Sequence, residues 1–275
     1  MKELTYITSR NNIYVQKYAK LSDKKYRESE KLFLIEGAKL FEEAVDAGVK
    51  FESVLFLENK NNEIILRTYE KIKSKTEYMD VNIFCLSENA FSKISTEKSP
   101  DGVICIGKYL DNLNFYNKIE KNTANRFNGE KIMLLYSLRD PGNVGTIVRS
   151  AVAFGFDRII FSDDSADPYN GRSMRAAMGA FFKIKIDFVG DFSSALNDLV
   201  DSGRRVFCAE LREGSKSLDD IDVKHDDCFV IGNEGHGIPI EISQKCTGSV
   251  YIPITPNSES LNAAIAASVL MFVQR

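Results

Sequence analysis

The chain has 275 residues, of which 44% are hydrophobic and 27% charged, and its formal net charge is −3. This length fits one large domain or two ordinary ones, and the composition excludes a disordered or fibrous chain. No apolar run approaches the roughly 20 residues that span a bilayer, and the polar N-terminus has no apolar signal core, so we expect a cytoplasmic protein without a membrane partner.

The cysteines also favour a cytoplasmic protein. Five cysteines form no CxxC pair, and most of them lie in apolar runs. They are Cys85, Cys105, Cys208, Cys228 and Cys246. We therefore expect buried, reduced thiols. Because the chain has only two histidines, His225 and His236, the sequence predicts no Cys/His zinc site and no metal cofactor.

The charge is unevenly distributed along the chain. Residues 1–31 contain eight basic and four acidic side chains, and Lys24, Lys25 and Arg27 lie close together among them. The charge pattern alone favours a solvated helix face. The alternative is a local patch that contacts phosphates, because affinity for nucleic acid depends on local rather than total charge.

The first 107 residues alternate apolar runs with helical patterns, which indicates a small α/β domain. Strands are predicted at 32–37, 51–57, 81–87 and 102–109, and amphipathic helices at 38–48 and 64–75. No catalytic motif is visible in this part of the chain. Residues 108–130 then break the pattern with six asparagines and no apolar period, which predicts a linker between domains.

From residue 131 to residue 275 the alternation of strands and helices resumes. Apolar runs predict strands at 131–138, 157–163, 183–189, 205–210, 227–232 and 249–254. Apolar strands separated by helices favour a parallel sheet that is covered on both faces. Ligands of such sheets bind beyond the carboxyl ends of the strands, so the loops that leave these strands are the candidate site.

The first of these loops is SLRDPGNVGTIVRSAVAFGF at 137–156. Asp-Pro-Gly is a turn signal, Asn143 is a good helix N-cap, and Gly145 allows close approach of backbone or ligand. Arg149 lies six residues beyond Asn143 on the predicted helix. An ordinary turn whose arginine pairs with a surface acid explains this loop equally well.

The second loop is FVIGNEGHGIP at 229–239, in which Gly232, Gly235 and Gly237 surround Glu234. These glycines leave backbone N–H groups free to contact a ligand. No GK[ST] follows, so the loop is not a P-loop, and the GxGxxG order of dinucleotide-binding folds is absent. His236 beside Glu234 suggests acid–base chemistry, but an exposed loop histidine without a chemical role is the simpler interpretation.

The third loop is YIPITPNSESLNAAIAAS at 251–268. It leaves a strand at Ile252, crosses a polar stretch and enters a helix of small residues at Ser260, Leu261 and Asn262. Ser260 and Asn262 could simply cap backbone groups. Four alanines in the helix allow very close packing, so tight packing of helix on sheet also explains this segment.

Taken together and in this order, the three loops resemble the motifs of the SpoU (TrmH-like) branch of the SPOUT RNA methyltransferases. The first motif is matched by Asn143-x-Gly145-x-x-x-Arg149, the second by Ile231-Gly232-Asn233-Glu234-Gly235-x-Gly237, and the third by Ile252-Pro253 followed by Ser260-Leu261-Asn262. The segment Arg175-Ala176-x-Met178-Gly179-Ala180 resembles the family's intervening helix, and ITSRNN…KYR…FLIEGAKL resembles its N-terminal substrate-binding domain. The final helix departs from the family pattern because Gln274 precedes the last arginine, where a glutamate is often found.

The resemblance implies a fold, a cofactor and partners. It implies a C-terminal parallel-sheet SPOUT domain with a trefoil knot, a smaller N-terminal α/β RNA-binding domain, and a homodimer formed through the catalytic domain. It implies methylation of a ribose 2′-hydroxyl in structured RNA, ribosomal RNA in the first place and transfer RNA in the second. The cofactor S-adenosylmethionine is expected at Leu211, Gly232, Gly235, Ile252 and Leu261, and RNA at Lys24, Lys25 and Arg27.

The catalytic residues that the resemblance implies are Asn143, Arg149, Glu234, Ser260 and Asn262. The sulfonium cofactor carries a reactive methyl group, so positioning and proton removal are left to the protein. The resemblance gives Arg149 the role of base. A guanidinium is normally always protonated, and we therefore prefer an electrostatic role, in which Arg149 would stabilise the developing alkoxide. Glu234 as the base is the second possibility.

Two other classes of protein stay open from the sequence. A knotted RNA-binding scaffold without activity would be a non-catalytic alternative, and the five intact polar residues argue against it. A dehydrogenase on a doubly wound sheet is disfavoured by the missing GxGxxG. The closing helix, 262–273, is apolar around most of its circumference. It therefore needs a second surface besides the sheet to cover it, which favours a homodimer.

Overall fold

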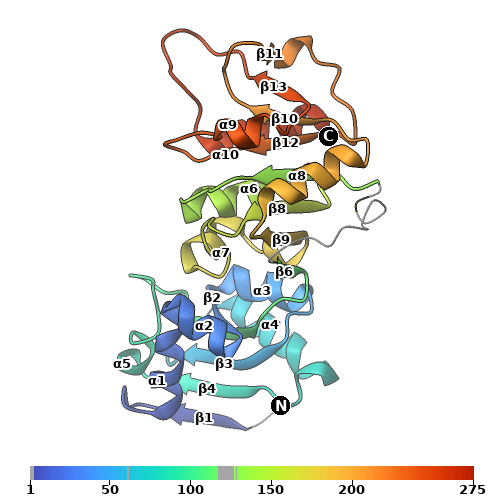
Figure 1. Ribbon diagram of the computed structural model, residues 1–275. Coiled ribbons are helices and arrows are strands. Elements are labelled where there is room, and N and C mark those ends of the chain that lie inside the picture. Colours follow the sequence, from blue (N-terminus) through green and yellow to red (C-terminus); the bar gives the residue numbers. More distant parts are fainter. Residues whose placement is uncertain (1–2, 61, 117–126, 128) are drawn as a thin grey trace. The chain divides into compact units, whose positions relative to one another are not determined.

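The computed structural model describes residues 3–60, 62–116, 127 and 129–275. The chain forms two compact units, and neither of them is one continuous stretch of sequence. The first comprises residues 1–111 and 167–182, and the second comprises residues 112–166 and 183–275. Figure 1 labels the helices and strands of both units. None of the helices in the described ranges is long and apolar enough to cross a membrane.

The first unit is built on a five-stranded sheet with the order β1-β4-β3-β5-β2 (Figure 1). The strands are β1 (Leu4–Ile7), β2 (Leu32–Glu36), β3 (Phe51–Leu57), β4 (Asn82–Leu86) and β5 (Val103–Lys108). Strands β1, β4 and β3 are parallel, whereas β5 runs antiparallel to both β3 and β2. The four strands that the sequence predicts in this region are confirmed, and β1 is an additional edge strand.

Helices pack against this sheet and enclose its core. They are α1 (Ile13–Ala19), α2 (Lys24–Glu30), α3 (Ala38–Asp46), α4 (Glu63–Lys73) and α5 (Glu88–Phe91). The predicted helices at 38–48 and 64–75 are confirmed as α3 and α4. Val15, Tyr18 and Phe91 are buried in one apolar cluster with residues of β4 and β5.

The segment 167–182 also belongs to the first unit, although the sequence pattern groups it with the residues after 131. Its helix α7 (Gly171–Ala177) packs against β2. The ring of Tyr169 stacks on Tyr109 with centroids 4.1 Å apart and lies 4.6 Å from the ring of Phe33. Arg175 Nε lies 2.7 Å from Glu97 Oε1. A helical pattern does not say which sheet a helix covers, and here these aromatic and ionic contacts decide it.

The second unit contains an eight-stranded, wholly parallel sheet with the order β11-β13-β10-β12-β7-β8-β9-β6 (Figure 1). The strands are β6 (Leu113–Tyr116), β7 (Ile132–Leu135), β8 (Arg158–Ser162), β9 (Lys185–Val189), β10 (Val206–Ala209), β11 (Lys216–Ser217), β12 (Cys228–Ile231) and β13 (Gly248–Tyr251). The parallel α/β sheet predicted from the apolar runs is confirmed. Strand β6 lies inside the predicted linker and pairs with β9, while residues 117–126 and 128 of that linker lie outside the described part of the chain.

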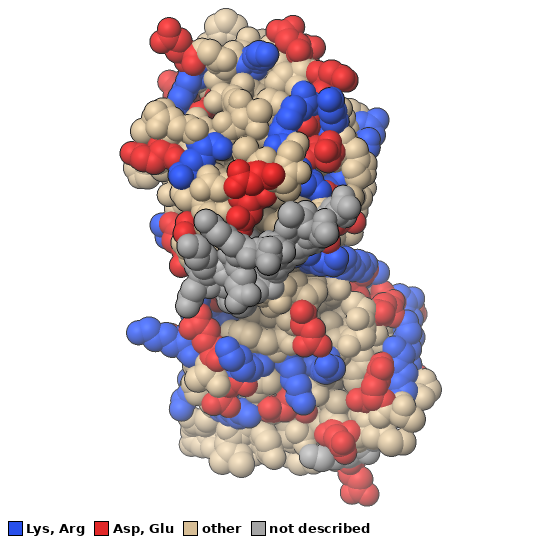
Figure 2. Space-filling model, turned by 45° about the vertical axis from the view of Figure 1, so that its right-hand side comes forward, with Lys and Arg blue, Asp and Glu red and all other residues tan. Residues whose placement is uncertain are grey.

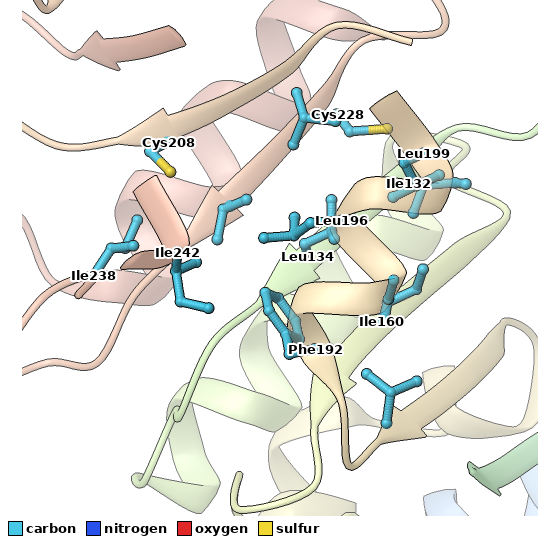
Figure 3. Packing of buried hydrophobic residues seen from close by; sticks show 14 of the residues in the cluster. Ile132, Leu134, Ile160, Phe192, Leu196, Leu199, Cys208, Cys228, Ile238 and Ile242 are labelled. Atoms are coloured by element: carbon cyan, nitrogen blue, oxygen red, sulfur yellow. The ribbon is translucent and has the colours of Figure 1, made fainter. Parts of the chain in front are cut away.

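Helices cover both faces of the parallel sheet. They are α6 (Pro141–Ala153), α8 (Phe192–Asp201), α9 (Ile240–Ser243) and α10 (Ala263–Gln274). Figure 3 shows Phe192, Leu196 and Leu199 of α8 among the apolar side chains of the sheet, including Ile132 and Leu134. Alternate residues of a strand point to opposite faces, so the neighbours of these two, Met133 and Leu135, face the other layer. That layer contains α6 and α10, which pack against each other.

The last turn of α10 is fixed by Gln274, which is buried. Its side-chain amide donates hydrogen bonds to the carbonyls of Lys224, His225 and Asp227, the last at 2.6 Å. A carboxylate cannot donate to three carbonyls when it is ionised. The residue that departs from the family pattern therefore has a structural role, which is to attach the C-terminus to the loop before β12.

Candidate active site

The three polar loops begin at the carboxyl edge of the parallel sheet. Strands β7 and β12 are neighbours in register, with Leu135 opposite Ile231. The pairing continues one residue further, because Tyr136 N donates to Ile231 O at 2.8 Å. The loops that follow these two strands therefore start side by side, although about 90 residues separate them in the chain.

A chain of hydrogen bonds connects Asn143, Glu234 and Asn262. The amide nitrogen of Asn143 donates to Glu234 Oε1 at 2.9 Å, and its amide oxygen accepts from Asn262 Nδ2 at 3.1 Å. The oxygen of Asn262 caps α10 by accepting from Ala264 N at 2.8 Å. Asp140, rather than Asn143, is the N-cap of α6, because its carboxylate accepts from Asn143 N. The side chain of Asn143 is therefore free of the capping role that the sequence predicts for it, and it connects two loops.

Glu234 is the centre of this network. Besides Asn143, the backbone N–H groups of Arg139 and Asp140 donate to its carboxylate, each at 3.2 Å. Desolvation by the surrounding loops opposes ionisation, but the hydrogen bond from Asn143 and those from the backbone outweigh it and lower the pKa of Glu234 below its usual value. An ionised carboxylate accepts hydrogen bonds well, but a lowered pKa makes it a weak base.

The shape of the second loop depends on Asn233 and two glycines. Asn233 Nδ2 donates to the carbonyl of Ser137 at 2.7 Å, and its amide oxygen accepts from the backbone N–H groups of Gly235 and His236. The backbones of Asn233 and Gly237 also pair with each other, and Gly237 has a φ of +66°. A Cβ on Gly232 would lie 2.6 Å from the carbonyl of Gly237, so only glycine fits there. An asparagine that precedes a run of glycines is a typical signal for such a turn.

A cleft of about 760 Å³ lies beside Glu234. Tyr136, Arg139 and His236 are among the residues that line it. Arg139 Nη2 lies 2.7 Å from Asp164 Oδ2. Desolvation opposes ionisation of Asp164, but hydrogen bonds from Ser162 and Ser137 and the charge of Arg139 lower its pKa. No sequence motif singled out Tyr136, Arg139 or Asp164, because their contribution comes from the folding of separate loops.

Arg149 lies elsewhere on α6. Six residues on a helix correspond to about 240° of rotation and about 9 Å of rise, so Arg149 and Asn143 lie on different faces. The side chain of Arg149 is exposed, and within the described ranges it forms neither an ion pair nor a hydrogen bond. Ser260 is exposed as well, and its carbonyl accepts from the Ser258 hydroxyl at 3.2 Å. The structure thus joins three of the five predicted catalytic residues and leaves Arg149 and Ser260 outside the network.

The residues predicted for the cofactor follow three adjacent strands. In the parallel register Cys208 lies opposite Val230 and Ala209 lies opposite Val250. Leu211, Gly232 and Ile252 each come two residues further along the chain, at the carboxyl edge. Leu211 is 77% exposed, an unusual position for a leucine, whereas Ile252 and Leu261 are half-buried. Apolar side chains of this kind, at the edge of a sheet, are the groups that commonly line small-molecule sites.

Comparison with known proteins decides between the classes that the sequence left open. The family model of the SpoU rRNA methylases matches residues 130–272. The chain belongs to the SpoU rRNA methylase family. Residues 12–105 match a second family model, the MRM3-like substrate binding domain. The chain is therefore an RNA methyltransferase that uses S-adenosylmethionine, and the resemblance stated from the three motifs is confirmed.

Relatives of this family match nearly the whole chain. A 23S rRNA (guanosine(2553)-2′-O)-methyltransferase of Bacillus subtilis, RlmP, is 30% identical over 97% of this chain and 97% of its own. The mitochondrial rRNA methyltransferase 3 of Xenopus tropicalis is 25% identical over 90% of this chain and 71% of its own. The crystal structure of an rRNA methyltransferase of Sinorhizobium meliloti superposes with a TM-score of 0.81 at 27% identity, covering 100% of this chain and 98% of that one. The AdoMet-bound form of that protein matches with a TM-score of 0.79.

One of the three residues expected to contact RNA is not available for it. Arg27 is only 4% exposed, and its guanidinium pairs with Asp167 and donates to the carbonyls of Leu21 and Ser22. The expectation that Arg27 binds phosphate is therefore corrected, because a buried and ion-paired guanidinium cannot reach a ligand. Lys24 and Lys25 are exposed, and Lys24 lies 3.9 Å from Glu28 in a surface pair of little strength.

The lowered pKa of Glu234 predicts a pH-dependent contribution to stability. A carboxylate with a lowered pKa in the folded state stabilises the fold above its unfolded pKa, and the contribution disappears as the pH falls through the folded pKa. Glu234→Gln should lower the free energy of unfolding at neutral pH by less than about 1 kcal/mol, since the exposed carboxylate is screened by solvent. Urea unfolding across the acid range measures this.

Asn143→Ala provides the matched comparison for this measurement. It removes the hydrogen bond that lowers the pKa of Glu234 most, so the acid-induced loss of stability should be smaller and should be complete at a higher pH than in the unchanged chain. A difference between Glu234→Gln and the unchanged chain that is the same at every pH would contradict this assignment.

Proposed function

We propose that this protein methylates a ribose 2′-hydroxyl of structured RNA, with ribosomal RNA as the substrate class. The observation that carries the proposal is the chain of hydrogen bonds Glu234–Asn143–Asn262 beside an open cleft. The printed activity of the Bacillus subtilis relative, which covers 97% of this chain, supports both the 2′-hydroxyl and the ribosomal substrate. Mapping of 2′-O-methyl sites in cellular RNA with and without the protein tests it.

The polar network positions the nucleotide. Bound S-adenosylmethionine supplies an electrophilic methyl group, so the protein has to align the 2′-hydroxyl and accommodate its developing charge. Glu234 fixes the carboxamide of Asn143, and Asn143 in turn fixes the carboxamide of Asn262. The polar groups of this network then orient the ribose. Because its pKa is lowered, Glu234 serves as an orienting acceptor in this proposal, and proton removal does not depend on it.

The cleft beside Glu234 takes the target nucleotide. Its volume of about 760 Å³ is ample for a nucleotide, and its lining combines an aromatic ring, a guanidinium and an imidazole from Tyr136, Arg139 and His236. Aromatic and guanidinium planes are the groups on which proteins stack unpaired RNA bases. In this reading His236 contacts the substrate, whereas the sequence favours a loop residue without a chemical role.

The working unit is a homodimer, and Arg149 acts with the polar network of the partner subunit. Asn143 and Arg149 lie on different faces of α6, so one chain does not bring both to the same point. The side of α10 next to α6 also carries exposed apolar groups: Ile265, Phe272 and Val273 are 52%, 49% and 45% exposed. Phe154 of α6 extends this surface, since its ring lies 6.0 Å from that of Phe272. A two-fold axis through this surface would place Arg149 of each subunit against the partner subunit.

The remaining assignments follow from the family. We propose that residues 1–107 bind RNA, that 131–275 hold the catalytic machinery, that the loops after β12 and β13 form a trefoil knot, and that the protein works in the cytoplasm. The strand order is compatible with the knot, because β13 lies on the far side of β10 from β12 and the connection between β12 and β13 has to pass β10. Leu211, Gly232, Gly235, Ile252 and Leu261 would hold the cofactor there.

Arg149→Ala should abolish methyl transfer, with a loss of about 100-fold or more, because it removes the charge that stabilises the alkoxide. The affinity for S-adenosylmethionine should stay nearly unchanged, since the cofactor loops lie elsewhere in the chain. Methyl transfer to bulk RNA with labelled cofactor and calorimetric titration of the cofactor measure the two. Thr146→Ala, on the same exposed face of α6, is the matched control and should retain activity. A large loss of cofactor binding in a folded Arg149→Ala variant would contradict the assignment.

Removal of charge at Lys24 and Lys25 should weaken RNA binding and reduce its salt dependence. Figure 2 shows basic and acidic side chains interspersed over the surface, so affinity has to come from local groups. Each lost phosphate contact lowers the slope of log K against log salt by about 0.7 to 0.9. Filter binding of ribosomal RNA by Lys24→Ala/Lys25→Ala at several salt concentrations measures the slope, with Lys73→Ala, paired with Glu70, as control. An unchanged slope would show that these lysines belong to a solvated helix face and do not contact RNA.

Ile265→Glu/Phe272→Glu should give a monomer that has lost activity, because charge on a two-fold interface is buried twice. Sedimentation at micromolar concentration gives the mass, and the methyl-transfer assay gives the activity. Leu66→Glu is the matched control, since Leu66 of α4 is 56% exposed and lies in the other unit. An active species with the mass of one 30.9 kDa chain would disprove the dimer.

A further inference from the structure

Two cysteines that the proposed reaction does not use lie in contact. The Sγ atoms of Cys208 and Cys246 are 3.1 Å apart, although 38 positions separate the residues in the chain. Cys208 is a buried residue of β10, and Cys246 is half-buried in the connection between α9 and β13. The sequence predicts only buried, separate thiols, because the spacing of cysteines along a chain does not reveal which of them meet.

The surroundings hold both residues in place. The backbone N–H of Thr247, next to Cys246, donates to Val206 O at 2.8 Å, so the connection is attached to β10 two residues before Cys208. Cys208 belongs to the apolar cluster shown in Figure 3, and Cys246 packs against that cluster from its edge. Among the described residues no other two cysteine sulfurs are in contact, since Cys85 and Cys105 lie in the first unit and Cys228 lies near the carbonyl of Asp226.

We propose that Cys208 and Cys246 form a modification site at which a peroxide closes an intramolecular disulfide, and that this bond weakens cofactor binding. A disulfide has a sulfur–sulfur length of about 2.05 Å, so the two atoms have to approach by about 1 Å. The half-buried Cys246 can supply this movement by rotation of its side chain, and it is the sulfur that an oxidant reaches first.

The chemistry balances in two steps. Cys246 gives up its proton, its sulfur attacks one peroxide oxygen, and the O–O bond breaks. Cys246 becomes a sulfenic acid, and the other oxygen leaves as hydroxide, which takes up that proton to form water. The sulfur of Cys208 then attacks Cys246 Sγ, the S–O bond breaks, and the hydroxide leaves as water with the proton of Cys208. Two thiols thereby lose two electrons and two protons, and the peroxide is reduced to two waters.

The order of the steps follows from the environments of the two thiols. The hydrogen bond to Cys246 and burial both raise the pKa of Cys208, which keeps Cys208 in its thiol form. The partly exposed Cys246 attacks the oxidant, and Cys208 is the resolving thiol that waits next to it.

The bond would restrain the loops assigned to the cofactor, and this part of the inference rests on the proposed function. Cys208 lies three residues before Leu211, and Cys246 lies six residues before Ile252. The disulfide would also close a ring that contains β12, the loop of Glu234 and α9. Movement of Cys246 toward Cys208 would displace α9, which precedes it. Ser243 of α9 donates to Glu210, the residue after β10. Ile238, in the loop before α9, lies in the same apolar cluster as Cys208.

Hydrogen peroxide on the full-length chain tests the inference. Titration of thiols should fall from five to three per chain, the mass should fall by about 2 Da, and peptide mapping should show one species that joins Cys208 to Cys246. Cys246→Ser should keep its remaining four thiols, and Cys85→Ser, a change at the other half-buried cysteine, should still form the bond. A stable sulfinic acid at Cys246, or a disulfide between other cysteines, would overturn the proposal.

The effect on the cofactor is measured on the same samples. Oxidised protein should bind S-adenosylmethionine at least threefold more weakly by calorimetry, and dithiothreitol should restore the affinity. Cys246→Ser should be insensitive to peroxide. Equal affinity before and after formation of the bond would overturn its functional part. Failure of the reduced protein to bind the cofactor would instead contradict the proposed function, so the two failures are distinguishable.

Discussion

The carboxylate of Glu234 is the point at which distant parts of the second unit depend on one another. It accepts hydrogen bonds from two backbone N–H groups of the loop after β7 and from the side chain of Asn143 at the start of α6. Through Asn143 it also fixes Asn262, which caps the last helix. Because the carboxyl ends of parallel neighbouring strands meet at one edge, one acceptor can serve all three segments. Loss of this single charge would remove the hydrogen bonds that connect these segments, although each segment also has hydrogen bonds of its own.

The sequence predicted those parts of the structure in which the local pattern of apolar residues agrees with the fold. Apolar runs separated by helices predicted the parallel sheet, and the rule that loops meet at the carboxyl edge selected the loops that contain Asn143, Glu234 and Asn262. It was uninformative where the partner lies far away in the chain. Nothing in the basic run at 24–27 shows that Arg27 alone turns inward to Asp167, and nothing in the helical pattern of 171–177 shows that α7 covers β2. Short edge strands such as β1 and β6 also escape pattern reading, because pairing with a neighbour rather than alternation defines them.

The first motif shows how a sequence signature can combine two roles that geometry separates. Asn143 and Arg149 belong to one short pattern, but a spacing of six residues is not a helical repeat, and the two side chains point to different faces of α6. Asn143 faces its own loops, whereas Arg149 faces solvent. A motif in a sequence therefore does not imply that its residues meet at one point of the folded chain.

The division of the chain into units constrains how the domains can be separated. The boundary at 108–130 is a natural place to divide the sequence, but the first unit takes its residues 167–182 from within the range that matches the methylase family. Without that segment the guanidinium of Arg27 would lose Asp167 and stay buried without a counter-charge, which is strongly destabilising. The rings of Phe33 and Tyr109 would lose Tyr169, which packs against both. The contacts that stabilise the first unit therefore include a helix that lies within the residues matching the methylase family.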